Sequence, residues 1–171
     1  ITSRMTKGET YQHTLVSQTI SEVILLSPKT SNNAFVYPLY IYKNAGNVKP
    51  DSSHATSVFQ MSMIFEPTEP YLARKANLDS KIVSSLSQAY RKNLKPEEIF
   101  CYVYALLYSN AYRKKYMEFL KTDFPRVPFA ASYKVFQSLA EKGEKLVALH
   151  LLKSNKLNKP IVACEGDGGN K

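Results

Sequence analysis

One stretch of the 171-residue chain, residues 95–128, restricts the possible fold more than any other. Pro96 suits the first position of a helix, and Glu97 and Glu98 follow where the positive end of a helix dipole favours carboxylates. Apolar residues then recur at helical spacing over a stripe wider than a surface helix needs: Ile99, Phe100, Tyr102, Val103, Tyr104, Leu106, Leu107 and Tyr108. The sequence therefore predicts a central helix that is largely buried.

A second helix is expected directly after Ser109 and Asn110, which interrupt the first one. Prolines 125 and 128 then forbid further helix and favour extended backbone before them. The second helix should turn its apolar residues one way and its cations the other, with Tyr112, Tyr116, Phe119 and Leu120 opposed to Arg113, Lys114, Lys115 and Lys121. The tyrosines of both helices could stack on bases, but their helical spacing favours a core role with the hydroxyl groups at the rim.

Residues 1–70 are typical of β structure. Thr14–Leu26 is rich in β-branched residues and fits one strand or two, and Phe35–Tyr42 is a further extended run whose Pro38 belongs on an edge or at a bulge. Thr56–Phe65 alternates with a period of two, as a half-buried strand does. Between these runs, Lys43–Ser57 reads as a long exposed loop, either one with a function of its own or a disordered insertion.

Residues 71–171 are typical of helices. A connector that includes Arg74 and Lys75 leads to Asp79, which should cap a helix with Ile82, Val83 and Leu86 inside that runs to about Tyr90. Ser132 should cap a helix that runs to about Leu152, and a polar tail follows. We therefore expect an α+β fold, with a β-rich subdomain at 1–70 and a helical subdomain at 71–171.

The net charge of +9 is unevenly distributed along the chain. Residues 1–70 hold five Lys/Arg and five Asp/Glu, residues 71–128 hold eleven against five, and residues 129–171 hold seven against four. A basic surplus confined to the helical part suits a polyanion such as DNA, because each neutralised phosphate releases counterions. The alternative is that the Lys-rich helix faces are ordinary solvated surface.

Motifs for catalysis are missing from the sequence. It contains no G-x-x-x-x-G-K-[ST], G-x-G-x-x-G or G-x-S-x-G pattern. His13, His54 and His150 are too scattered to suggest a metal site or a general base, and His150 reads as a packed core residue. Cys101 and Cys164 form neither a disulfide framework nor a metal-binding pair, so we expect reduced thiols in a cytoplasmic protein. No apolar run approaches the length of a transmembrane helix.

The string EEIFCYVYALLYSNAYRKKYMEFLKTDFPRVPF resembles the C-terminal specificity region of single-chain restriction-modification enzymes of types ISP and IIG. Three further pieces fit this resemblance in order: PLYIY at Pro38–Tyr42, the pair Asn77-Leu78, and LVALHLL at Leu146–Leu152. Enzymes of this family fuse a nuclease, an adenine methyltransferase and a target recognition domain. The resemblance covers most of the chain.

This resemblance implies sequence-specific recognition of double-stranded DNA. It also implies a methyltransferase domain of the same parent chain as partner, and S-adenosylmethionine as a cofactor of the parent but not of this fragment. A start at Ile1 fits a fragment of a longer protein, or a processed chain. The rival interpretation is a protein-interaction module that docks on a partner domain and does not bind DNA.

Clustered cations are the candidates for DNA contact. Arg4 and Lys7, in a polar segment beside the β part, are candidates for base contact together with the Lys43–Ser57 loop. The candidates for phosphate contact lie in the basic half: Arg74, Lys75, Arg91, Lys92, Arg113, Lys114 and Lys115.

We predict that the 171-residue chain alone neither methylates nor cuts DNA. The family's methyltransferase carries an Asn-Pro-Pro-Tyr type motif and its nuclease an acidic pair ending in Glu-x-Lys, and neither occurs in this sequence. Incubation with DNA and S-adenosylmethionine, followed by digestion and measurement of methyladenine, checks this. Methyladenine above the level of a protein-free control would contradict the prediction.

Overall fold

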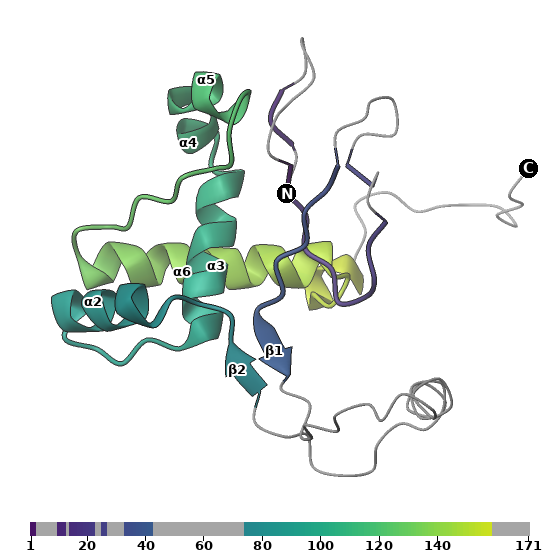
Figure 1. Cartoon of the computed structure of the whole chain (residues 1–171). Coiled ribbons are helices and arrows are strands. Elements are labelled where there is room, and N and C mark those ends of the chain that lie inside the picture. The colour runs from purple at the N-terminus through teal and green to yellow at the C-terminus, as the bar shows by residue number, and fades with distance from the viewer. Residues whose placement is uncertain (3–9, 13, 23–24, 27–32, 43–73, 159–171) are drawn as a thin grey trace, which may run out of the picture.

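Two long helices cross at the centre of the molecule. The computed structural model describes residues 1–2, 10–12, 14–22, 25–26, 33–42 and 74–158. Within these ranges α3 (Pro96–Tyr108) and α6 (Tyr133–His150) lie across one another (Figure 1). Shorter elements surround the crossing, with α2 (Ser80–Tyr90) beside the lower half of α3, and α4 (Asn110–Lys115) and α5 (Met117–Leu120) at its upper end. A 3-10 helix, η1 (Asn155–Asn158), follows α6.

The helices begin where their capping residues predict. The Asp79 carboxylate accepts a hydrogen bond from the Lys81 N–H at 2.8 Å, which satisfies a free donor at the start of α2. Ser132 accepts from the Val135 N–H at the start of α6. In α3, Pro96 occupies the first turn, and Glu98 accepts from the Lys95 N–H at 2.7 Å. The predicted starts of these three helices are confirmed.

The core lies between α2, α3 and α6. Tyr102 stacks on Phe136 with ring centroids 4.8 Å apart, and both side chains are almost fully buried. At the crossing, Gly143 of α6 lies against the backbone of Cys101 in α3, where a Cβ atom would be only 1.9 Å from the carbonyl oxygen. The buried members of this cluster are Leu86, Tyr90, Leu94, Ile99, Tyr102, Phe136 and Ala140.

Three tyrosine hydroxyl groups bind alternate carbonyl groups of the extended segment 126–130. Tyr112 donates to Arg126 O at 2.6 Å, Tyr102 to Pro128 O at 2.8 Å and Tyr90 to Ala130 O at 2.5 Å. These donors come from α4, α3 and α2 respectively. The segment that joins α5 to α6 is therefore bound by three helices, and the predicted core role of Tyr102 and Tyr112 is confirmed.

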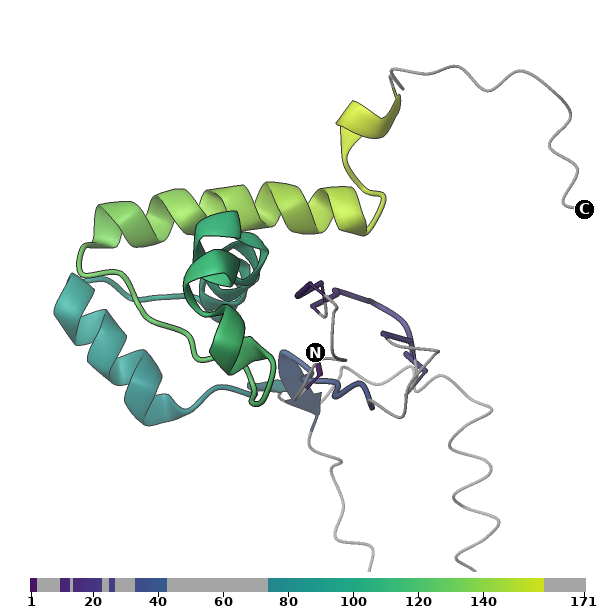
Figure 2. The same ribbon diagram turned by 90° about the horizontal axis from the view of Figure 1, so that it is seen from above.

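A second cluster packs the N-terminal segment against the upper end of α3. Tyr11 is buried with Leu107, Tyr112 and Leu120, and the Tyr108 hydroxyl donates to Thr14 O at 2.8 Å. Figure 2 shows this segment on the side of α3 that faces away from α6. Residues 14–22 and 25–26 form no strand, so the strand predicted at Thr14–Leu26 is wrong for these described positions. The bond from the Tyr108 hydroxyl to Thr14 O binds the start of this irregular segment to α3 instead.

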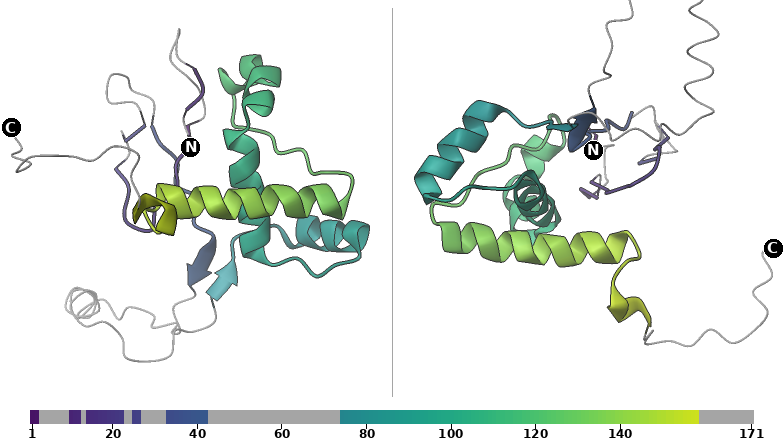
Figure 3. Two further views of the ribbon diagram at one scale, coloured as in Figure 1. Left: turned by 180° about the vertical axis from the view of Figure 1, so that it is seen from behind. Right: turned by 90° about the horizontal axis from the view of Figure 1, so that it is seen from below.

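In the described residues, the sheet consists of one short antiparallel pair of strands. β1 (Tyr40–Tyr42) pairs with β2 (Arg74–Ala76), with Tyr40 opposite Ala76. Figure 3 shows the pair beside the N-terminal segment. The connector predicted at Arg74 and Lys75 is thus a strand, because Tyr40–Tyr42 offers its backbone as a partner. The fold is mostly helical and α+β at this coarse level.

Two predicted elements, the strand at Thr56–Phe65 and the Lys43–Ser57 loop, lie outside the described residues. The pairing of β1 with β2 joins residues on both sides of the boundary predicted at residue 70. The division into subdomains 1–70 and 71–171 stays a prediction.

Replacement of Gly143 by alanine should destabilise the protein by roughly 1–3 kcal/mol. Helix propensity alone predicts the opposite sign, a gain of about 1 kcal/mol. The added Cβ would overlap the backbone of Cys101, so the two helices must separate. Urea unfolding measures the difference, with Ser138→Ala at an exposed position of α6 as control. A Gly143→Ala variant as stable as wild type would contradict this account of the crossing.

Replacement of Tyr102 by phenylalanine should cost about 1 kcal/mol of stability. The ring is kept, so the change isolates the hydrogen bond to the Pro128 carbonyl, which would lose this donor. The control is Tyr37→Phe, because that side chain is 59% exposed. Equal urea midpoints for the Tyr102→Phe variant and wild type would remove this bond from the interactions that stabilise the fold.

Candidate nucleic-acid interface

The cations predicted to contact phosphate lie in three separate places. Figure 1 shows β2, with Arg74 and Lys75, below the crossing of α3 and α6, and α4, with residues 113–115, at the upper end of α3. Arg91 and Lys92 follow the last turn of α2, at the opposite end of that helix from β2. Arg4, Lys7 and the Lys43–Ser57 loop lie outside the described residues, so their predicted base contacts stay predictions.

Arg91 and Lys92 form an exposed turn with an unusual backbone. Arg91 has a φ of 51°, in the left-handed region that glycine adopts most easily. Its N–H donates to Gln88 O at 3.2 Å and the Lys92 N–H donates to Ser87 O at 3.1 Å. These bonds satisfy two carbonyl groups in the last turn of α2, so two adjacent cations are displayed at a well-defined helix end. The Lys92 Nζ lies 6.0 Å from the ring centroid of Tyr133.

The cations of α4 divide into two kinds. Lys114 and Lys115 are exposed, in the last turn where the negative end of a helix favours positive charge. Arg113 is half-buried, and its Nε donates to Leu107 O at 2.7 Å. Its guanidinium carbon lies 4.6 Å from the centroid of the Tyr108 ring. The expectation that Arg113 faces solvent with the lysines is wrong, because α4 is packed against the end of α3 and its carbonyl groups.

Arg74 and Lys75 lie on opposite faces of β2, since successive side chains of a strand alternate. The guanidinium carbon of Arg74 lies 4.3 Å from the centroid of the Tyr40 ring. The Tyr40 hydroxyl donates to the Glu97 carboxylate. That bond, with a smaller contribution from the Arg74 charge, lowers the pKa of Glu97. Sequence reasoning missed this arrangement, because Tyr40 and Glu97 are 57 positions apart.

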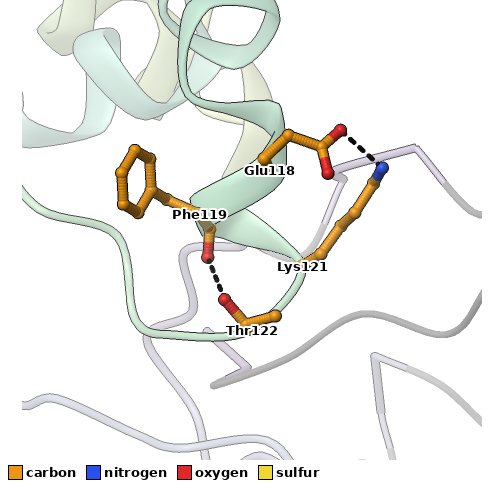
Figure 4. Close-up of polar contacts among 4 residues, drawn as sticks. All are labelled: Glu118, Phe119, Lys121 and Thr122. Atoms are coloured by element: carbon orange, nitrogen blue, oxygen red, sulfur yellow. Dashed lines mark hydrogen bonds and ion pairs between the residues drawn. The ribbon is translucent and has the colours of Figure 1, made fainter.

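Two further cations are engaged by neighbouring carboxylates. Lys121 Nζ lies 2.7 Å from Glu118 Oε1, and Arg126 Nη2 lies 3.6 Å from Asp123 Oδ2. Figure 4 shows the Glu118–Lys121 pair on one side of the turn and the Phe119 ring on the other. Phe119 is 65% exposed, so the predicted inward orientation of this side chain is wrong. The helix breaks at Tyr116, which shifts the phase of the residues after it.

The tyrosines of α3 and α4 do not form an open stacking surface. Tyr102, Tyr104 and Tyr112 are buried, and desolvation raises the pKa of each phenol. The predicted core histidine, His150, is instead exposed at the end of α6. Its Nδ1 lies 2.7 Å from the Tyr104 hydroxyl, so it caps the edge of the core.

Within the described ranges, no group of three or more His, Cys, Asp or Glu side chains could hold a metal ion. The Cys101 thiol is half-buried, and desolvation raises its pKa. No described helix has the length and apolar character needed to cross a membrane.

Comparison with protein-family models matches residues 1–171, the whole chain, to the Type ISP C-terminal specificity domain. No curated protein and no solved structure gave a significant match. The family match agrees with the resemblance carried by the α3–α4 region, the segment up to Pro128 and the end of α6. This chain therefore belongs to the family of Type ISP C-terminal specificity domains.

Proposed function

We propose that this domain binds double-stranded DNA and recognises a specific target sequence for a restriction-modification enzyme. The observation that carries the proposal is the match of the whole chain to a specificity-domain family. The placement of charge supports it, since the basic surplus lies in residues 71–171 and several of its cations are exposed at helix ends. A polyanion would gain from these cations by counterion release.

The parent protein, in this proposal, is an adenine-N6 DNA methyltransferase with or without an endonuclease, acting in the cytoplasm. Its methyltransferase domain is the intramolecular partner of this domain and binds S-adenosylmethionine. In this proposal the present chain does not hold that cofactor, and it lacks the Asn-Pro-Pro-Tyr type motif of the family's catalytic domain. Its own part is to bind and orient the duplex.

Four exposed cations are the strongest candidates for phosphate contact: Arg91, Lys92, Lys114 and Lys115. Arg113 is less suited, because its side chain is committed to the Leu107 carbonyl and the Tyr108 ring. Lys75 is exposed on the strand pair and is a further candidate. Base contact from Arg4, Lys7 and the Lys43–Ser57 loop remains part of the proposal.

The double variant Arg91→Asn/Lys92→Gln should bind all duplexes more weakly. Asparagine tolerates the left-handed backbone of position 91, so loss of charge is separated from loss of fold. If both cations contact phosphates, the slope of log affinity against log salt should flatten by roughly 1.8, about 0.9 per contact. The measurement is a titration of several duplex sequences at several salt concentrations, with the full-length protein.

Lys142→Gln/Lys145→Gln is the matched control, since it removes the same charge from exposed positions of α6. An unchanged slope for the Arg91/Lys92 variant would exclude that turn from the interface. Equal losses in both double variants would show an effect of net charge alone. A wild-type protein with no salt-dependent affinity for DNA would overturn the proposed function and favour a docking module.

A further inference from the structure

Arg74 is placed differently from the other arginines of the described ranges. Arg113 is half-buried and Arg126 pairs with Asp123. Arg91 stands on a turn with a strained backbone. Arg74 alone among these four combines an exposed position with a guanidinium group held over an aromatic ring, 4.3 Å from its centroid. It is therefore a cation whose direction the fold restricts while leaving it open to a ligand.

The register of the strand pair produces this stacking. Ala76 lies opposite Tyr40, and Arg74 lies opposite Tyr42. Arg74 and Tyr40 are therefore diagonal neighbours on one face of the ribbon, a separation that long and aromatic side chains can bridge. Arginine suits this position better than lysine, because its planar group stacks on aromatic faces. Lys75 and Ile41, directly opposite one another, share the other face.

The aromatic ring is itself fixed by the helical part. The Tyr40 hydroxyl donates to the Glu97 carboxylate in the first turn of α3, and that bond is the largest cause of the lowered pKa of Glu97. Asn77 braces the same strand pair, since its Nδ2 donates to Pro38 O at 3.0 Å and its N–H donates to Leu39 O at 2.9 Å. The two strands and α3 thus form one support for the Arg74 side chain.

We propose that the β1–β2 ribbon enters the major groove and that Arg74 reads the edge of a guanine, with Tyr40 and Glu97 as positioning residues. This inference rests on the proposed DNA-binding function and replaces the phosphate contact first expected of Arg74. The major groove accommodates a two-stranded ribbon, and arginine binds the O6 and N7 atoms of guanine with two parallel hydrogen bonds.

The pre-organised geometry favours a base contact over a phosphate contact. A phosphate can be bound by the mobile point charge of a lysine such as Lys75 as well as by an arginine, so it does not require a side chain that is fixed in advance. A guanine edge requires two donors in a fixed plane, and stacking on Tyr40 restricts the guanidinium before DNA arrives. Less side-chain freedom is then lost on binding, which improves affinity for the matching base. The ribbon also lies beside the N-terminal segment and away from α6, as Figures 2 and 3 show.

The test compares sequence preferences, so the target need not be known beforehand. The full-length protein and its variants select from random-sequence duplexes, and sequencing gives the base preference at each position. The variants Arg74→Lys and Arg74→Gln should both lose a guanine preference at one position, by roughly 5- to 150-fold, with the other positions unchanged. The variant Tyr40→Phe keeps the ring but not the bond to Glu97, so it should weaken the same preference partially.

The control is Lys75→Gln, on the opposite face of the same strand. It should leave every base preference unchanged and reduce the slope of log affinity against log salt by about 1, as expected for one lost phosphate contact. Thermal unfolding of each variant shows that the fold is retained. If the Arg74 variants keep the guanine preference, whether their binding is uniformly weaker or unchanged, the base contact alone is overturned. A wild-type protein that selects no sequence would overturn the proposed function as well, so the two failures are distinguishable.

Discussion

The bonds from three tyrosine hydroxyl groups to the segment 126–130 are the interaction on which the helical architecture depends. Proline at 125 and 128 removes backbone donors, so this segment cannot enter a regular ladder, yet its carbonyl groups still need partners at the edge of the core. Tyr90, Tyr102 and Tyr112 supply them at every second residue. Because the segment leads directly into α6, its position determines where that helix starts. It thereby helps to bring Gly143 of α6 against the backbone of α3.

Sequence reasoning succeeds wherever a structural choice is made by neighbouring residues. Asp79, Pro96 and Ser132 predict the starts of α2, α3 and α6, because each satisfies or removes a free N–H at a helix terminus. The apolar stripe of α3 likewise predicts burial, because helical period and burial are properties of the same face. The end of α2 at Tyr90 also agrees with the end predicted from the sequence. These features require no knowledge of the rest of the chain.

The remaining features depend on contacts between distant residues, which no local pattern encodes. Residues 14–22 have strong β propensity, but they form irregular backbone, bound at Thr14 by the Tyr108 hydroxyl. Arg74 and Lys75 look like part of a connector until Tyr40–Tyr42 pairs with them. Within the candidate site, the periodic pattern grouped Arg113 with Lys114 and Lys115, whereas the end of α3 draws Arg113 inward. The exposed lysines of the site were predictable, but the orientation of its arginines was not.

The charges at the end of α2 explain why Arg91, despite its left-handed backbone conformation, is compatible with anion binding there. A residue other than glycine in this conformation costs about 1–2 kcal/mol, and Leu152 after α6, with a φ of 58°, carries the same penalty. At Arg91 part of the cost is offset, because a cation beside a helix C-terminus gains about 0.3–1 kcal/mol. The helix end contributes only about half a negative charge, whereas Arg91 and Lys92 contribute two positive ones. An approaching phosphate therefore meets a net positive tip of about +1.5. Lys114 and Lys115 likewise place two positive charges at a helix C-terminus, the end of α4. Leu152 has no charge to offset its strain.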